Sequence, residues 1–495
     1  GVSVGESLSL LPLVEALDSV AGMRAVLGLF EGVCTGAADG YGRMAGRPAM
    51  TLLHLGPGCA NGIANLHNAR RAHTPVLNII GDHATWHRQA DPPLAMDIPA
   101  LAGTVSRWCR ASTSADDLAR DTCAAVAAAR QGGVATLIVP QDHQWEPVLN
   151  QADAVAAPTP ITIDARAIEE AARLLNGPGM TALLLGGRAL SAEGLRLSAR
   201  IRAATGCDLL AETFPGRIER GAGLPDVQRI PYLPEMAIPM LARYANFVIA
   251  GAKEPIAFFG YQGTTGRLLS DSQRCLTLGA DPQSLEAALA ALADTLGAPN
   301  GIPEAVLAPA KRPDLPSGPL HGAAVCEVLA CLQPADAIVV EEAVTSSLAY
   351  YPATAGVPPF SLLTLTGGSL GQGMPCAVGA ALACPDRTVI DFQADGSSLY
   401  TPQALWTQAR ERLNITTIIC SNRSYDILKL EMARAGTLNP GTNARRLTDL
   451  SGVDWVKFAE GLGVPACQAS TCEELARALA TALASPGPHL IEAIM

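Results

Sequence analysis

The chain has 495 residues, 49% of them hydrophobic, which is more than one hydrophobic core usually holds, so we expect about three domains of ~150 residues. Its formal net charge of −11 argues against binding to nucleic acid or to an anionic membrane surface, and no apolar run reaches the ~20 residues of a membrane span. The 13 cysteines are odd in number and form no CxxC pair, which favours reduced thiols in a cytoplasmic protein over a disulfide framework.

Two linker-like stretches divide the chain into three segments. Residues 151–165 and 297–322 are rich in Pro, Ala and Gly and show no period of 2 or 3.6, as is typical of interdomain connections. They predict domains at 1–150, 165–297 and 320–495. Within each segment strand-like and helical runs alternate, which predicts an α/β protein with three doubly wound parallel-sheet domains.

The first segment has strand-like runs at 25–30, 49–55, 76–80 and 134–139. Glu31 follows the first run and opens a helix of small residues that contains ADGYGR at 38–43. A lone Glu at a helix start usually only satisfies the helix dipole, and a lone His such as His54, in the loop LLHLGPG, is usually a packed residue. His83 and His87 have i, i+4 spacing but no third ligand nearby, so they do not predict zinc. A role for them in lining a substrate pocket stays open.

The central segment has strand-like runs at 181–185, 208–211, 247–250 and 274–278. Gly186 and Gly187 follow the first run as a nucleotide-binding turn would, but the chain contains no GxGxxG. A tight strand-to-helix turn explains these glycines better. We therefore predict no flavin in this segment.

The third segment has strand-like runs at 337–341, 388–392, 415–420 and 489–493. Asp395 follows the second run, in Asp-Gly-Ser, and Asn422 follows the third, with a helical stretch at 402–413 between them. One crossover helix and one strand separate the two residues, which places them side by side at the carboxyl edge of a parallel sheet. A carboxylate and an amide oxygen suit Mg²⁺, which shares its other positions with ligand phosphates. Asp-Gly-Ser alone would indicate only a turn.

Three motifs together resemble the thiamine-diphosphate-dependent enzymes that decarboxylate or join 2-oxo acids. They are the stretch 393–425, the helix that Glu31 opens, and LTGGSLGQGMPCAVGAAL at 365–382. The resemblance covers almost the whole chain. It implies that domain 1–150 binds the cofactor's pyrimidine, that 165–297 is the central domain and that 320–495 binds the diphosphate. Ala394 departs from the Gly that usually begins the metal motif, so the backbone there must avoid positive φ. Residues 1–17 read as a strand and then a helix, and in this family a helix normally precedes that point, so we expect residues before Gly1.

The resemblance implies thiamine diphosphate and Mg²⁺ as cofactors and assigns the residues that bind them. Asp395, Asn422 and the backbone carbonyl of Ser424 would bind the metal. Glu31 would be hydrogen-bonded to the aminopyrimidine ring and promote proton removal from the cofactor. Leu370 would wedge the cofactor into a bent form. Further cofactor contacts are expected from Thr345, Ser346, Gly368, Gly396, Ser397 and Tyr425. The family joins the first and third domains of different subunits, which implies a homodimer or homotetramer.

Among subfamilies, the chain is most similar to benzoylformate decarboxylase and to acetolactate-synthase-like proteins. His54 occupies the place of an active-site His of benzoylformate decarboxylase, and we predict that it is catalytic. The second catalytic His of that enzyme has no counterpart, because AKEPIAFFGYQG offers Tyr261 and Gln262 instead. We predict decarboxylation of a 2-oxo acid, with release of an aldehyde or ligation to a second carbonyl.

Four other functions are the alternatives. An acetolactate-synthase-type carboligase is the closest of them, and a flavin oxidase on the same scaffold is weaker. A non-catalytic binding protein of the same fold is disfavoured by the presence of Glu31, Asp395 and Asn422, and a nicotinamide dehydrogenase by the missing GxGxxG. The identity of the 2-oxo acid and of any regulatory subunit stays open.

Overall fold

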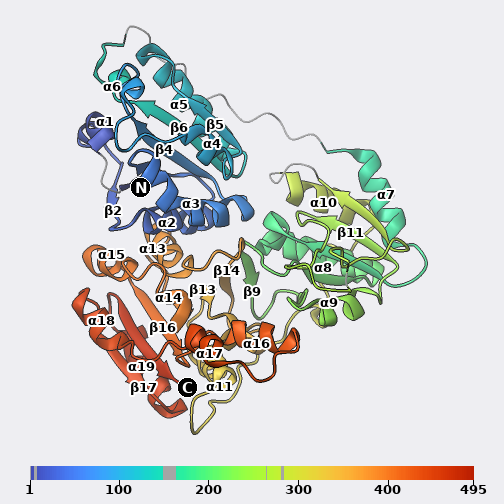
Figure 1. Cartoon of the computed structure of the whole chain (residues 1–495). Helices are drawn as coiled ribbons and strands as arrows, with labels where there is room; N and C mark the ends of the chain where they lie inside the picture. The colour runs from blue at the N-terminus through green and yellow to red at the C-terminus, as the bar shows by residue number, and fades with distance from the viewer. Residues whose placement is uncertain (1, 5–7, 149–162, 264, 280–283) are drawn as a thin grey trace. The chain divides into compact units, whose positions relative to one another are not determined.

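Each predicted domain contains its own parallel β-sheet in a computed structural model that describes residues 2–4, 8–148, 163–263, 265–279 and 284–495 (Figure 1). The chain forms two compact units. Unit 1 comprises Gly1–Ala157, Pro313–Ala353 and Thr364–Met495, and unit 2 comprises Pro158–Arg312 and Thr354–Leu363. Of the first predicted linker, residues 151–162 lie outside the described residues. The second contains the short 3-10 helix η5 (Glu304–Val306). The domain boundaries at 150, 165, 297 and 320 stay predictions.

The first sheet of unit 1 has the strand order β2-β1-β3-β4-β6-β5, and every pair is parallel. Neighbouring residues of a strand face two different apolar clusters: Leu53 and Ile80 belong to one, Leu52 and Ile79 to the other. The sheet is therefore covered on both faces, as a doubly wound sheet requires. Its strands are β1 (Val2–Val4), β2 (Ala25–Leu27), β3 (Ala49–Leu53), β4 (Val76–Asp82), β5 (Trp108–Ala111) and β6 (Val134–Pro140). The helices are α1 (Leu11–Leu17), α2 (Glu31–Ala45), α3 (Leu55–Arg71), α4 (Ile98–Gly103), α5 (Ala115–Arg130) and α6 (Asp142–Trp145).

Five strands of the second sheet of unit 1 are parallel and follow one another in the order β17-β18-β16-β15-β13. Its strands are β13 (Ile338–Glu342), β15 (Val389–Ala394), β16 (Ile415–Ser421), β17 (Ala466–Ala469) and β18 (His489–Ile494). The helical elements are α11 (Gly322–Leu332), η6 (Val344–Ser347), α12 (Tyr350–Ala353), α13 (Gly373–Ala383), α14 (Asp395–Ser398), α15 (Ala404–Glu411), α16 (Asp426–Arg434), α17 (Thr442–Thr448), α18 (Trp455–Gly461) and α19 (Cys472–Ala484). Residues of β13, β15 and β16 are almost all buried, which explains their continuous apolar runs.

Unit 2 contains a parallel sheet of order β10-β8-β7-β11-β12. The elements are β7 (Thr181–Leu185), β8 (Asp208–Ala211), β10 (Gln228–Arg229), β11 (Asn246–Ala250), β12 (Arg274–Leu278), α7 (Ala165–Leu175), η3 (Gly187–Leu190), α8 (Ala192–Thr205), α9 (Pro234–Leu241) and α10 (Leu285–Thr295). An additional antiparallel pair, β9 (Ile218–Arg220) with β14 (Phe360–Thr364), does not follow from the sequence patterns. The prediction of three parallel-sheet α/β domains is confirmed.

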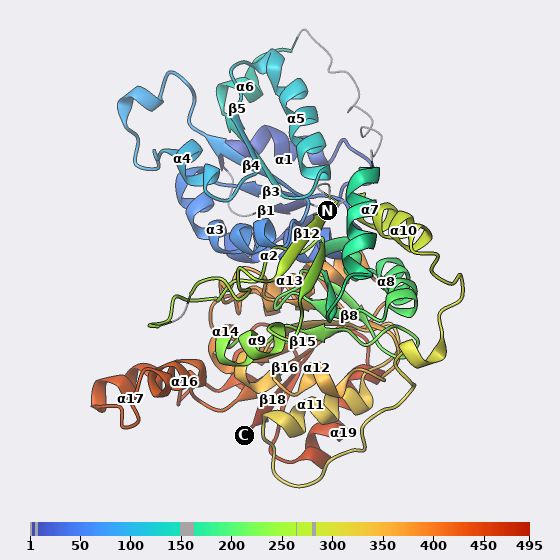
Figure 2. The ribbon, with the colours of Figure 1, turned by 90° about the vertical axis from the view of Figure 1, so that its right-hand side faces the viewer.

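Helix α2 packs directly against α13 within unit 1 (Figures 1 and 2). A Cβ atom at Gly40 would lie 2.0 Å from the carbonyl oxygen of Cys376, and one at Gly379 would lie 1.9 Å from that of Ala37. Only glycine allows such an approach of the two backbones. The contact places the helix that Glu31 opens against the helix that follows the Gly-rich segment.

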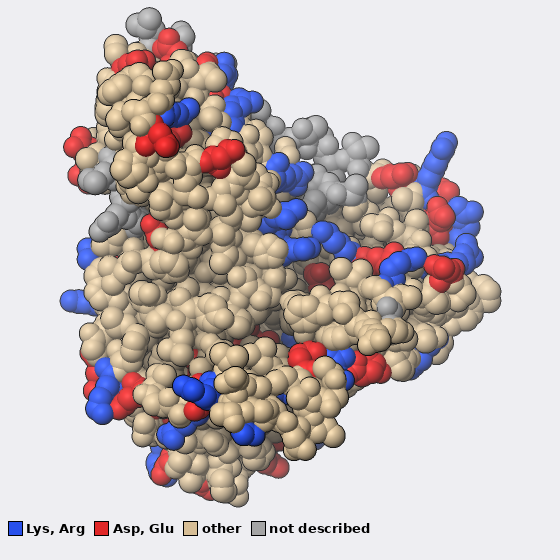
Figure 3. Space-filling view, in the orientation of Figure 1, with Lys and Arg blue, Asp and Glu red and all other residues tan. Residues whose placement is uncertain are grey.

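Charged residues are sparse in the sequence, and their two signs are mixed on the face shown in Figure 3. Only 16% of the residues are charged, and on the face shown in Figure 3 basic and acidic groups are interspersed among wide uncharged areas. Among the helices of the described ranges, none is both long and apolar enough to cross a membrane.

Candidate active site

The predicted metal motif forms a tight pair of turns after β15 and β16. Ala394 pairs with Cys420 in the parallel ladder, so Asp395 and Asn422 both emerge at the carboxyl edge of this sheet, as the spacing predicts. The turns are joined by Asp395, whose Oδ2 accepts the N–H of Arg423 at 2.6 Å. Arg423 has a φ of +55°, a conformation that lets the chain reverse directly after Asn422.

The oxygen atoms of this motif are suited to a hard cation. Asn422 Oδ1 accepts the N–H of Ser424 at 3.0 Å, and the Ser424 carbonyl accepts the N–H of Asp426 at 3.0 Å, so each oxygen keeps a second lone pair. The pKa of Asp395 is raised to about 6, mainly by burial and to a smaller extent by the neighbouring Asp426, while backbone N–H groups, that of Arg423 first, oppose the rise. A divalent cation would compensate the negative charge that burial penalises here, so the donor set fits Mg²⁺.

The other predicted cofactor contacts surround this turn. A Cβ atom on Gly396 would lie 2.3 Å from the ring of Tyr425, so the tyrosine packs on the bare glycine. Burial raises the pKa of Tyr425. The Ser397 hydroxyl donates to protein oxygens, namely the Glu342 carbonyl at 3.1 Å. A hydrogen bond from Ser397 to a diphosphate oxygen would therefore have to come from its backbone N–H, because the phosphate oxygen needs a donor.

The Gly-rich segment 367–373 and η6 supply the remaining predicted positions. Gly368 has a φ of +71° and Leu370 is half-buried, directly before α13. Thr345 is half-buried and Ser346 is buried within η6, which follows β13 at the same sheet edge. The structure thus gathers the third-domain positions around the carboxyl ends of β13, β15 and β16.

Glu31 is the first residue of α2 and faces α3. Its Oε2 accepts a hydrogen bond from Asn61 Nδ2 at 3.1 Å, and a Cβ atom on Gly58 would lie 3.2 Å from its Oε1. Asn65, one turn further along α3, donates through Nδ2 to the carbonyls of Gly32 at 2.8 Å and Gly371 at 3.1 Å. The start of α2 is therefore linked to the Gly-rich segment. Asn61 and Asn65 carry no motif that marks them in the sequence.

His54 lies at the start of α3, directly after β3. Its Nδ1 lies 3.2 Å from the hydroxyl oxygen of Ser9, which is 2% exposed. A Cβ atom on Gly81 would lie 2.0 Å from that hydroxyl oxygen, so the glycine in β4 leaves the space that Ser9 occupies. Leu55 has a φ of +54°, which turns the chain sharply after the histidine. Ser9 was not predicted from the sequence; in the structure it follows the first strand, β1.

His83 and His87 lie in the loop after β4. Their ring centroids are 5.6 Å apart in an edge-to-face arrangement. His83 Nε2 is buried, with no hydrogen-bond partner within the described part of the chain. The position of this nitrogen at the sheet edge is compatible with lining a polar substrate pocket.

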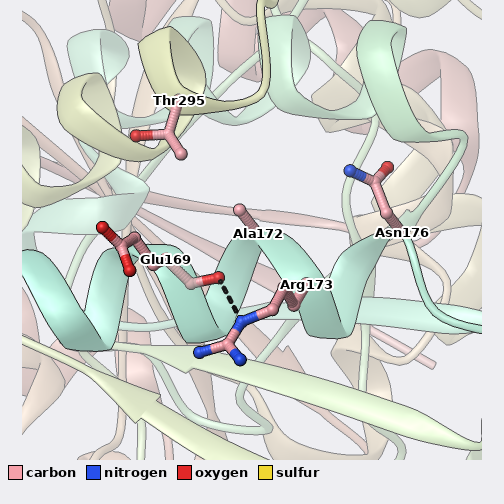
Figure 4. A pocket seen from close by; sticks show the side chains of 5 residues that line it. All are labelled: Glu169, Ala172, Arg173, Asn176 and Thr295. Atoms are coloured by element: carbon pink, nitrogen blue, oxygen red, sulfur yellow. Dashed lines mark hydrogen bonds between the residues drawn. The ribbon is translucent and has the colours of Figure 1, made fainter.

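An open depression on unit 2 contains none of these residues (Figure 4). It lies between α7 and α10 and is lined by Glu169, Ala172, Arg173, Asn176 and Thr295. Arg173 is turned along its own helix, where Nε donates to the Glu169 carbonyl at 3.4 Å. Among its described residues, this depression contains neither a carboxylate at the end of a strand nor a Gly-rich segment. Unit 1 contains both, so the candidate site lies in unit 1.

Comparison with known proteins identifies the family of the chain. Residues 4–101 match the model "Thiamine pyrophosphate enzyme, N-terminal TPP binding domain", and residues 347–493 match "Thiamine pyrophosphate enzyme, C-terminal TPP binding domain". The chain is 48% identical over 489 residues to a provisionally named acetolactate synthase large subunit, IlvX, of Mycobacterium tuberculosis, with 97% of this chain and 93% of that one covered. It is 31% identical over 508 residues to benzoylformate decarboxylase of Pseudomonas aeruginosa, with 95% and 91% covered.

The chain therefore belongs to the thiamine-diphosphate-dependent enzymes of the decarboxylase and acetolactate synthase family. A solved structure of the same fold is the 4-hydroxybenzoylformate decarboxylase of Rhodococcus jostii, with a TM-score of 0.85 at 24% identity over 100% of this chain and 96% of that one. The resemblance predicted from the motifs is confirmed.

Proposed function

We propose that the chain is a thiamine-diphosphate- and Mg²⁺-dependent enzyme that decarboxylates a 2-oxo acid. The observation that supports the proposal is the pair of turns at the carboxyl edge of β15 and β16, where Asp395 accepts the N–H of the residue that follows Asn422. The names of the benzoylformate decarboxylase and acetolactate synthase relatives support a 2-oxo acid as the substrate.

Some residues of this site would bind the cofactor, and others would take part in proton transfer. Asp395, Asn422 and the Ser424 carbonyl would bind Mg²⁺ and, through it, the diphosphate. When bound, thiamine diphosphate would supply a nucleophilic carbon and an acceptor for the electron pair that remains when CO₂ leaves the 2-oxo acid. Glu31 would be hydrogen-bonded to the pyrimidine ring, with Asn61 holding its carboxylate in place. His54, held by Ser9, would orient the substrate carboxylate or deliver a proton to the product.

Two outcomes follow decarboxylation, and different observations favour each. The position of His54 next to a buried serine favours proton delivery to the product of decarboxylation, which would leave as an aldehyde. This outcome corresponds to a benzoylformate-decarboxylase-like enzyme. The 48% identity to the acetolactate synthase relative favours capture by a second carbonyl, which is the second candidate. In both cases we propose a homodimer or homotetramer in the cytoplasm, in which Glu31 and the metal motif of one site come from different subunits.

The test measures CO₂, aldehyde and ligation product from a panel of 2-oxo acids, with and without an acceptor aldehyde. We expect activity to require both thiamine diphosphate and Mg²⁺, and Asp395→Ala to abolish retention of the cofactor. Asp386→Ala is the matched control, because Asp386 is an exposed aspartate of the same domain outside the site. Full activity in a chelated, cofactor-stripped preparation would exclude this function.

A further inference from the structure

The last residue of β13, Glu342, has a buried carboxylate that binds the Gly-rich segment. Its side chain is 2% exposed. Oε1 accepts the N–H groups of Gly371 at 2.7 Å and Gln372 at 3.2 Å, and Oε2 accepts that of Gly373 at 2.6 Å. Three successive backbone donors therefore converge on one carboxylate.

This arrangement has an electrostatic cost, which indicates a purpose beyond packing. Within the described ranges no lysine or arginine forms an ion pair with Glu342, so the three N–H groups and the start of the 11-residue helix α13 are its compensation. Burial raises the pKa of Glu342 to about 8, the three N–H groups oppose the rise, and the nearby Asp391 adds to it. A glutamine or leucine would fill the space at lower cost, but neither could accept all three donors.

The segment that Glu342 binds would be mobile without such an anchor. Gly368 and Gly371 have φ values of +71° and +92°, and glycines lose more conformational freedom on ordering than any other residue. A Cβ atom on Gly373 would lie 1.8 Å from Gln393 Nε2 and 2.9 Å from Glu342 Oε2, so the segment is pressed onto the sheet edge. The backbone carbonyl of Glu342 also accepts the Ser397 hydroxyl of the Asp395 turn at 3.1 Å.

We propose that Glu342 is a positioning residue that fixes the Gly-rich segment 367–373 relative to the Asp395 turn before any cofactor binds. The inference rests on the proposed function, because this segment contains Gly368, an expected cofactor contact, and Leu370, which is expected to bend the cofactor. Glu342 touches neither substrate nor cofactor in this role. It acts through the backbone it holds, which prepares the site and lowers the ordering cost of binding.

The first experiment uses the unmodified protein and amide hydrogen exchange. We expect the amides of Gly371, Gln372 and Gly373 to be protected in the cofactor-free protein and to gain little further protection from thiamine diphosphate with Mg²⁺. Free exchange that becomes protected only on cofactor addition would show that the segment is not prearranged and would overturn the inference.

The second experiment compares variants by calorimetric titration with thiamine diphosphate at saturating Mg²⁺. In Glu342→Gln the amide NH₂ faces a backbone donor, so at least one bond is lost, and we expect the dissociation constant to rise at least tenfold. Glu342→Asp keeps the charge and should show a smaller rise. Glu492→Gln, which removes another buried carboxylate (1% exposed) in the same sheet, should leave the affinity unchanged.

The outcomes separate the two proposals. Wild-type affinity in Glu342→Gln, or an equal loss in Glu492→Gln, would reduce Glu342 to a packing residue. If Glu342→Gln does not fold, the affinity of Glu342→Asp and the exchange measurement decide whether Glu342 positions the segment. If the wild-type protein binds no thiamine diphosphate, the proposed function is wrong, and Glu342 has no part in preparing a cofactor site. Protected amides would in that case show only that Glu342 orders the segment.

Discussion

Replacing Gly40 by alanine would introduce one methyl group where helices α2 and α13 touch. The new Cβ atom would lie 2.0 Å from the carbonyl oxygen of Cys376 and 2.7 Å from its carbonyl carbon. Unstrained heavy-atom contacts lie near ~3.5 Å, so the helices would have to separate by about 1 Å or more. Both atoms belong to the backbone of α13, so no rotamer change can relieve the clash.

The cost of this separation follows from what it disrupts. Overpacking of a dense interior typically costs about 1–3 kcal/mol, and we expect the upper end because both contacting surfaces are backbone. Alanine also gains about 0.5–1 kcal/mol over glycine inside a helix, which leaves a net loss of roughly 2 kcal/mol. Because Arg43 of α2 donates to the Thr364 carbonyl at 2.8 Å, a shift of the helix would also strain this link.

Urea unfolding followed by tryptophan fluorescence measures this loss. The tryptophans are Trp86, Trp108, Trp145, Trp406 and Trp455, and all lie in unit 1, where the two helices meet. Gly103→Ala is the matched control, because a Cβ atom at Gly103 would meet nothing within 4 Å at the end of α4. We expect a lower unfolding midpoint for Gly40→Ala and an unchanged or slightly higher one for Gly103→Ala. Equal midpoints for the two variants would refute the packing argument.

Three further predictions concern single side chains. Glu31→Gln should keep the fold and the cofactor but lower turnover by ~10²-fold or more, because an amide cannot exchange a proton; wild-type proton exchange at the cofactor's reactive carbon would contradict this. His54→Ala should lower turnover by a similar factor at nearly unchanged cofactor affinity, and an unchanged rate and product ratio would make it a packing residue. Glu212→Gln tests pH-dependent stability in unit 2. Burial raises the pKa of Glu212 to about 7, so its ionisation destabilises the folded state increasingly as pH rises from ~4.5 to 7. Far-UV circular dichroism should show a variant more stable by up to ~3 kcal/mol at pH 8 and little changed at pH 4.5; the same difference at both values would refute the assignment.

The sequence predicted the strand-end residues because alternating strands and helices leave few choices for where a parallel strand ends. Asp395 and Asn422 meet as expected, since one crossover unit separates them. The contact between Ser9 and His54 could not be predicted, because it depends on β1 lying between β2 and β3 in the sheet order. The pairing of β9 with β14 was equally inaccessible, because a three-residue strand carries no period and its partner lies far along the chain.

Three carboxylates at the site have raised pKa values that depend on burial and cannot be predicted from residue spacing. Glu342, Asp391 and Asp395 lie within or directly after β13 and β15, and burial raises their pKa values to about 8, 7 and 6. In the sequence Glu342 and Asp391 look like ordinary strand residues, since their charge becomes costly only when the sheet is covered. The described ion pairs include none of the three. This group of buried acidic side chains, which have hydrogen-bond donors but no described ion pair, is poorly suited to bind an anion directly and well suited to bind a divalent cation first. Mg²⁺ would thus relieve a cost already present in the folded chain, and the diphosphate would bind through the metal rather than to the acidic residues themselves.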